Sequence, residues 1–142
     1  MAHKNSIDKL QEIQLIEAAI KVRENAYAPY SGYLVGAAVL SATGKVFTGC
    51  NVENASYGAT ICAERTAILK MVSEGEKCIK AIAIVGGKAH ENALDYAYPC
   101  GACRQVISEF ASEDCMVLVA KSVEDYQQLC FADLLPQGFE FI

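Results

Sequence analysis

Two short apolar runs constrain the fold most strongly. Lys80–Val85 (KAIAIV) and Met116–Ala120 (MVLVA) have the length of strands, and the first shows no alternation between apolar and polar side chains. A strand of this kind is buried on both faces, as in a sheet that helices cover on each side. The two runs therefore predict interior strands of a covered sheet.

The other patterns along the chain supply a hairpin and helices. Tyr33–Ser41 and Lys45–Glu53 are strand-like segments separated by a turn at 42–44, which predicts a β-hairpin. A first helix is expected from Ser6, as its N-cap, to about Tyr27, and a second from near Ile61 to Ser73. Residues 86–98 are expected to form a loop, after which a third helix begins with Pro99 as its first residue. A short helix is expected in the C-terminal tail. A hairpin followed by β-α-β-α-β units predicts an α/β fold, a three-layer α/β/α sandwich around a mixed sheet.

Length and composition indicate a single domain that associates with other copies. The chain has 142 residues without internal repeat or linker, so residues 1–142 are expected to form one domain. Hydrophobic residues make up 53% of it, yet it has no apolar run of about 18 residues that would span a membrane. The apolar excess is therefore expected to be buried between subunits of a homo-oligomer.

The net charge and the cysteine content indicate which binding partners and which cellular compartment to expect. The net charge is −5 and the twelve Lys and Arg are scattered, which disfavours a nucleic acid polymer as partner and favours a small ligand. The N-terminal residues lack the apolar segment of a secretory signal. With seven cysteines, this predicts a reducing, cytoplasmic location in which some thiols bind metal or react.

Three cysteines have the spacing of a catalytic zinc site. Cys100 and Cys103 form a C-x-x-C motif at a predicted helix start, which alone fits either a redox dithiol or half of a zinc site. Cys62 also lies at a predicted helix start, and two helix N-termini that follow sheet strands can bring three thiols to one point. Three protein ligands leave the fourth tetrahedral position for water, as in catalytic rather than structural zinc sites.

Two charged residues lie two and three positions after Cys62. Glu64 would lie within one helical turn of the metal, where a carboxylate can accept a proton from an activated water and pass it on. Arg65 would offset the negative charge of three thiolates. The alternatives are a solvated glutamate favoured by the helix dipole and a surface arginine paired with any carboxylate.

The sequence C-A-E followed by P-C-x-x-C resembles the zinc nucleoside and nucleobase deaminases, with Cys62 at a position where many members have histidine. Between about Ala18 and Phe139 the chain is similar to the small cytidine deaminases. The segments that carry this likeness are Ala28–Ser31, Val35–Ala38, Gly49–Ala55 and Cys100–Ile107.

The resemblance implies an activity and an assembly. It implies a five-stranded sheet, one Zn²⁺ per subunit, a homotetramer, and hydrolytic deamination of cytidine and 2′-deoxycytidine to uridine and 2′-deoxyuridine in pyrimidine salvage. Alternatives are a deaminase of a modified cytosine nucleoside, of the blasticidin type, and a non-catalytic zinc-binding or dithiol redox module. The acidic charge disfavours an enzyme that edits polynucleotides.

The resemblance also implies substrate contacts. Asn51 and Glu53 match the pair that binds the ribose, and Tyr33 takes a position where the family commonly has Phe against the pyrimidine ring. The backbone around Ala63 and Cys100 is expected to orient the 4-amino group and the water, and Phe139 to reach the site of a neighbouring subunit.

Some parts of the chain depart from the family pattern or have no assigned role. The segment Ala89–Tyr98 is unlike the short loop of the family, and Tyr98 replaces a small residue before the C-x-x-C motif. The remaining cysteines are interpreted as small core or near-surface residues and the two histidines as unrelated to metal binding: Cys50, Cys78, Cys115, Cys130, His3 and His90.

Overall fold

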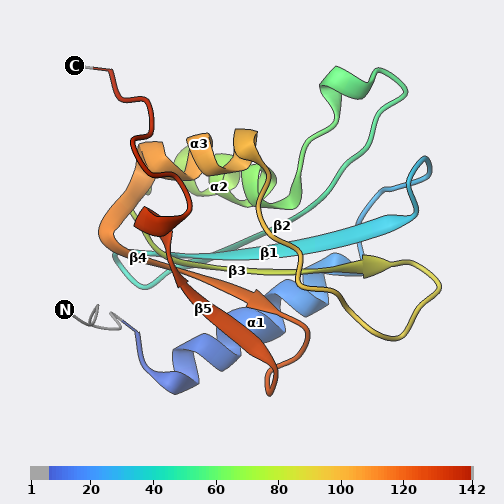
Figure 1. Ribbon diagram of the computed structural model, residues 1–142, viewed down its shortest axis with the longest axis horizontal. Helices are drawn as coiled ribbons and strands as arrows, with labels where there is room; N and C mark the ends of the chain where they lie inside the picture. Colours follow the sequence, from blue (N-terminus) through green and yellow to red (C-terminus); the bar gives the residue numbers. More distant parts are fainter. Residues whose placement is uncertain (1–6, 142) are drawn as a thin grey trace.

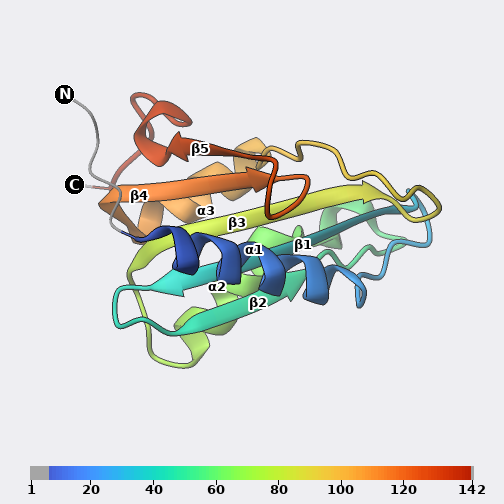
Figure 2. The same ribbon diagram turned by 90° about the horizontal axis from the view of Figure 1, so that it is seen from below.

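A five-stranded mixed sheet forms the centre of the fold, with strand order β2-β1-β3-β4-β5. The computed structural model describes residues 7–141 of the chain. Its elements are α1 (Lys9–Arg23), β1 (Tyr33–Ser41), β2 (Val46–Cys50), the 3₁₀-helix Tyr57–Ala59, α2 (Ala63–Ser73), β3 (Ile79–Lys88), α3 (Gly101–Phe110), β4 (Ala111–Ala120), β5 (Tyr126–Cys130) and the 3₁₀-helix Phe131–Asp133. Helix α1 covers one face of the sheet and α2 and α3 cover the other (Figure 1). Figure 2, seen from below, shows α1 in front of the strands. The expected three-layer α/β/α architecture is confirmed.

The two apolar runs are the central strands. β3 and β4 pair in parallel, with Ile82 opposite Val117. Side chains alternate between the two faces: Ile82 and Ile84 pack in the core beneath α2 and α3, whereas Ala81 and Ala83 pack in the core beneath α1. Each of these side chains is at most 1% exposed, which explains why the run contains no polar alternation.

Helix α1 begins at Lys9, and its N-cap is Asp8. The Asp8 carboxylate accepts from the Gln11 N–H at 2.8 Å, and the Gln11 side chain accepts from the Asp8 N–H at 3.0 Å. This reciprocal capping box makes the cap expected at Ser6 wrong, and Ser6 itself lies outside the described residues. The helix also ends at Arg23, earlier than Tyr27.

Several other boundaries differ from expectation. α3 begins at Gly101 with Cys100 as its N-cap, so Pro99 precedes the helix rather than opening it. β3 continues to Lys88, so the loop that follows is shorter. The sequence patterns did not locate strand β5, because YQQLC has no regular alternation of apolar and polar residues. Within residues 7–141, no helix has both the length and the apolar character needed to cross a membrane.

Candidate active site

The N-termini of α2 and α3 meet beside the sheet and bring three thiols together. Cys62 is the N-cap of α2, Cys100 is the N-cap of α3, and Cys103 lies in the first turn of α3. Their sulfur atoms all lie within 4.8 Å of one another, and the Sγ atoms of Cys62 and Cys100 are 3.8 Å apart. The cluster predicted from sequence spacing is therefore present.

The spacing of these sulfurs fits a tetrahedral metal ion. Ligands at a Zn–S distance of about 2.3 Å in tetrahedral arrangement lie about 3.8 Å from one another. A disulfide would instead require about 2.05 Å, and all three thiols are free. Two helix N-termini also direct their positive dipole ends towards the sulfurs, which stabilises thiolates. The donor set suits zinc.

The thiols share protons unequally. A hydrogen bond from Cys103, aided by Arg65, lowers the pKa of Cys62 to about 5 against the opposing effect of burial. The pKa of Cys103 is raised by its hydrogen bond to Cys62 and by burial. One sulfur therefore ionises readily and another holds its proton. A cation that binds to the cluster displaces such protons, as is general for thiolate metal sites.

Glu64 lies in the first turn of α2, and its carboxyl group is buried. The residue is 4% exposed and lines the same cavity as Cys62 and Cys100. Burial is the main cause that raises the pKa of Glu64 to about 7, and the negative charge of Cys62 adds to it. A carboxyl group with this pKa can both accept and release a proton near neutrality, the property required of a general acid–base group.

Arg65 lies beside the sulfurs. Its Nη2 donates to the Cys62 Sγ at 3.4 Å, and this hydrogen bond is the main cause that raises the pKa of Arg65. Its Nε is buried and has no hydrogen-bond partner among residues 7–141. The guanidinium group is therefore held by the thiolate cluster rather than by a carboxylate, which places positive charge where three thiolates concentrate negative charge.

A cavity of about 530 Å³ opens beside the thiol cluster. Besides Cys62 and Cys100, its walls contain five residues expected from the sequence, namely Tyr33, Asn51, Glu53, Ala63 and Glu64. They also contain residues to which the sequence assigned no role: Ser31, Val35, Thr60, Ile84, Tyr96, Ala97 and Tyr98. The volume matches the size of ordinary small-molecule sites.

The carboxamide of Asn51 holds the start of β1. Its Oδ1 accepts from the Val35 N–H at 2.9 Å and its Nδ2 donates to the Tyr33 carbonyl at 2.8 Å. Asn51 follows the end of β2 at Cys50, so it lies just beyond the strand rather than within the expected Lys45–Glu53 strand. One amide proton and one lone pair remain for a ligand.

Glu53 is held by a nearby turn. Its Oε1 accepts from the N–H groups of Tyr30 and Ser31, both at 3.0 Å, and its Oε2 accepts from the Ser31 hydroxyl. The hydroxyl bond is the main cause that lowers the pKa of Glu53, so the group is an anion at neutral pH. Ser31 belongs to Ala28–Ser31, one of the segments that carry the family resemblance, but the resemblance did not assign it to the site.

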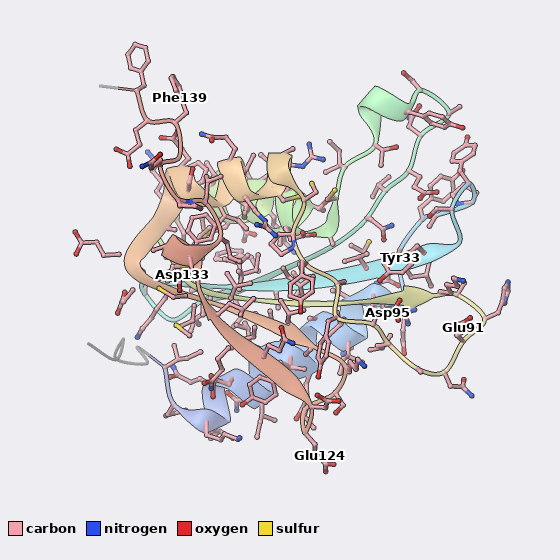
Figure 3. All side chains as sticks on the ribbon, in the orientation of Figure 1. Tyr33, Glu91, Asp95, Glu124, Asp133 and Phe139 are labelled. Atoms are coloured by element: carbon pink, nitrogen blue, oxygen red, sulfur yellow. The ribbon has the colours of Figure 1, made fainter. Side chains whose placement is uncertain are left out.

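Phe139 lies far from this cavity within one chain. It is 73% exposed, and the Gln105 Nε2 donates to its carbonyl at 3.2 Å. Figure 3 shows Phe139 on the C-terminal tail, at the opposite side of the molecule from Tyr33. The expected contact of Phe139 is with a neighbouring subunit's site, and it stays a prediction.

Among residues 7–141, the other cysteines and His90 are not part of the metal-binding cluster. Cys115 and Cys130 are buried, Cys50 and Cys78 are half-buried, and burial raises the pKa of Cys115 to about 12. His90 is exposed in the loop after β3, and His3 lies outside the described residues.

Comparison with known proteins establishes the family. Residues 9–119 match the family model of the cytidine and deoxycytidylate deaminase zinc-binding region. The chain is 46% identical over 125 residues to the cytidine deaminase of Halalkalibacterium halodurans, an alignment that covers 88% of this chain and 91% of the relative. The crystal structure of cytidine deaminase from Burkholderia pseudomallei superposes with a TM-score of 0.79 at 47% identity, covering 89% of this chain and 97% of that one. The chain belongs to the zinc-binding cytidine and deoxycytidylate deaminase family.

A more distant relative bears on the alternative substrate. The chain is 32% identical over 112 residues to the blasticidin-S deaminase of Bacillus cereus, and the alignment covers 77% of this chain and 79% of the relative. This identity is well below that to the Halalkalibacterium halodurans protein.

Proposed function

We propose that the protein catalyses the hydrolytic deamination of cytidine and 2′-deoxycytidine to uridine and 2′-deoxyuridine, with release of ammonia. The observation that carries this proposal is a cluster of three thiols next to a cavity of nucleoside size, whose wall contains two of these thiols and the buried carboxyl group of Glu64. Membership of the zinc-binding deaminase family supports it. The alternative of a non-catalytic zinc module leaves the buried Glu64 without a role.

Cys62, Cys100 and Cys103 would hold one zinc ion. When bound, zinc supplies a water molecule whose pKa is lowered towards about 7. Arg65, hydrogen-bonded to Cys62, reduces the negative charge that three thiolates place beside that water. These residues set the acidity of the site.

Glu64 moves the protons of the reaction. Hydrolysis replaces the 4-amino group of the ring by oxygen from water, so a proton must pass from the water to ring N3 and another to the departing ammonia. Glu64 is the carboxyl group that lines the cavity beside the thiols, and its pKa is raised to about 7. It can accept a proton and return it within one catalytic cycle.

The remaining wall residues bind the nucleoside. Tyr33 offers an aromatic ring against the base. Asn51 and Glu53 offer the polar groups that bind the ribose hydroxyls, and their attachment to the backbone at 30–35 fixes them before substrate arrives. The backbone of Ala63 orients the 4-amino group. The presence of both Asn51 and Glu53 favours an ordinary nucleoside as substrate over a modified one of the blasticidin type.

We further propose that the protein works as a homo-oligomer, a homotetramer, in the cytosol. Support comes from the exposed aromatic residues Tyr57 and Phe139, which are 80% and 73% exposed, since apolar surface of this kind is typical of subunit interfaces. All seven cysteines are free, as in proteins of reducing compartments.

A substrate panel tests the proposal. Purified protein is mixed with cytidine, deoxycytidine, free cytosine or blasticidin S, and the fall in ultraviolet absorbance is followed. Turnover of both nucleosides, with little reaction of cytosine because it lacks the ribose, is expected. The absence of turnover with either nucleoside would overturn the proposal, and a strong preference for blasticidin S would support the alternative.

A further inference from the structure

The loop at 89–98, which joins β3 to α3, is fastened at several points and forms part of the cavity wall. The Asp95 N–H donates to the Gly86 carbonyl at 2.7 Å. The Tyr96 hydroxyl donates to Asp125, and the Tyr98 hydroxyl donates to the Gln127 side chain at 2.7 Å. The loop is thus tied both to β3 and to the β4–β5 region, and its segment 96–98 lines the cavity.

Asp95 of this loop contacts the aromatic residue of the cavity. The Tyr33 hydroxyl donates to the Asp95 Oδ2 at 3.2 Å. Figure 3 shows the two side chains next to each other at one end of the sheet. Burial and the neighbouring Asp95 carboxylate raise the pKa of Tyr33, so the phenol keeps its proton and donates at neutral pH.

The ring of Tyr33 is confined between the sheet and the loop. A Cβ atom added to Gly86 would lie 3.1 Å from the Tyr33 Cε1 and 2.8 Å from the Ala97 Cβ. The ring and the loop therefore pack directly on the bare backbone of β3. With its Cε1 atom against Gly86 and its hydroxyl held by Asp95, the ring has little freedom to rotate.

Resting on the proposed function, we propose that Asp95 is a positioning residue for substrate, which fixes the Tyr33 ring in the orientation that receives the base. A tyrosine at this place needs a partner, because a bound base would otherwise strip water from an unpaired hydroxyl at a cost in affinity. Asp95 supplies that partner outside the cavity. A ring ordered before binding also loses less conformational entropy when substrate arrives.

This assignment connects two features of the sequence. Tyr33 stands where the resembling family commonly has Phe, and the loop at 89–98 departs from the family pattern. In the structure these two departures are in contact through the Tyr33–Asp95 hydrogen bond. The loop thus provides the acceptor that the hydroxyl of Tyr33 requires.

A double-mutant cycle tests the inference. The variants are Asp95→Ala, Tyr33→Phe and the two combined, with Asp95→Asn to retain an acceptor oxygen and Glu91→Ala as the control. Glu91 is exposed at the tip of the same loop, so its loss changes the loop charge equally without touching Tyr33 (Figure 3). Kinetics with cytidine and thermal stability are measured for each variant.

Asp95→Ala should raise KM about 3- to 10-fold, the effect of losing a partly exposed hydrogen bond to a charged group, with kcat changed less than about twofold. Asp95→Asn should restore most of the affinity and Glu91→Ala should have no effect. In the Tyr33→Phe background the Asp95→Ala change should add nothing. An equal rise in KM in that background, or an unchanged KM in Asp95→Ala, would overturn the inference.

A readout without substrate separates this inference from the proposed function. In protein labelled with ¹³C-tyrosine, the ring signal of Tyr33 is assigned by its loss in Tyr33→Phe. It should shift in Asp95→Ala and stay in place in Glu91→Ala. An unmoved Tyr33 signal in Asp95→Ala refutes the positioning role even if cytidine is turned over, whereas lack of turnover by the unaltered protein refutes only the proposed function.

Discussion

Replacement of Gly49 by alanine tests how tightly the sheet holds the catalytic helix. Gly49 lies in β2 directly beneath α2, the helix whose N-cap is Cys62 and whose first turn contains Glu64. A Cβ atom at this position would lie 2.4 Å from the Ala67 backbone nitrogen and 2.9 Å from the Ala63 carbonyl. Both contacts are with backbone, so no side-chain rotation can relieve them.

The magnitude follows from these distances. Ordinary contact begins near 3.4 Å, so α2 must move away from β2 by about 1 Å. Overpacking of this kind lowers the free energy of unfolding by about 1–3 kcal/mol, and a clash with fixed backbone is expected at the upper end of this range. A displacement of about 1 Å in a catalytic group can lower the rate about 100-fold. Gly49→Ala should therefore lose about 3 kcal/mol of unfolding free energy and about 100-fold in kcat/KM.

Urea unfolding at fixed protein concentration measures the first effect, and initial rates with cytidine measure the second. Gly58→Ala is the matched control, because a Cβ atom at Gly58 meets nothing within 4 Å. Its unfolding midpoint should stay within error of the unaltered protein. A Gly49→Ala protein with normal stability and normal activity would refute the reasoning that direct contact between β2 and α2 sets the position of Glu64.

Three further predictions concern the surroundings of the site and the packing of α1. Arg104 donates to the Pro99 carbonyl at 2.8 Å and to the Leu134 carbonyl at 2.9 Å, and so holds the backbone next to Cys100. Arg104→Ala should therefore weaken zinc retention about 10-fold, measured in competition with a chromophoric chelator. Unchanged retention would show that Arg104 does not support the metal site. Glu12 is 2% exposed and accepts from two side chains of β5, so Glu12→Ala should lower the unfolding free energy by about 2 kcal/mol and Glu12→Gln by less, as urea titration would show. Removal of zinc by a chelator should lower Tm and make the exposed Cys100 thiol open to alkylation, measured by mass spectrometry; equal labelling before and after chelation would argue against metal at this thiol.

The core of the fold and the thiol cluster could be predicted because their signals are local. Interior strands covered on both faces contain uninterrupted apolar residues, as in Lys80–Val85, and the pattern needs no knowledge of the partner strand. Helix N-termini are likewise marked by short motifs, which placed Cys62 and Cys100 at two neighbouring helix starts. The capping box of Asp8 and Gln11 is also a local signal, and its D-x-x-Q spacing could have located the start of α1.

The rest depends on contacts between distant segments. Strand β5 lies at the sheet edge and shows no regular alternation of apolar and polar residues, so its pairing with β4 leaves little trace in YQQLC. The contacts of Asn51 with Val35 and of Tyr33 with Asp95 join residues far apart in the chain. No spacing rule marks such pairs, and only the folded arrangement of β1, β2 and the loop at 89–98 reveals them.

The central claim is that three cysteines hold zinc while Glu64 moves the protons. Measuring bound zinc and cytidine turnover in parallel on Glu64→Ala tests it most directly, because this substitution leaves Cys62, Cys100 and Cys103 in place. The expected result is one zinc ion per chain, a folded protein and no turnover. A Glu64→Ala protein that holds stoichiometric zinc and retains near-normal activity would contradict the account.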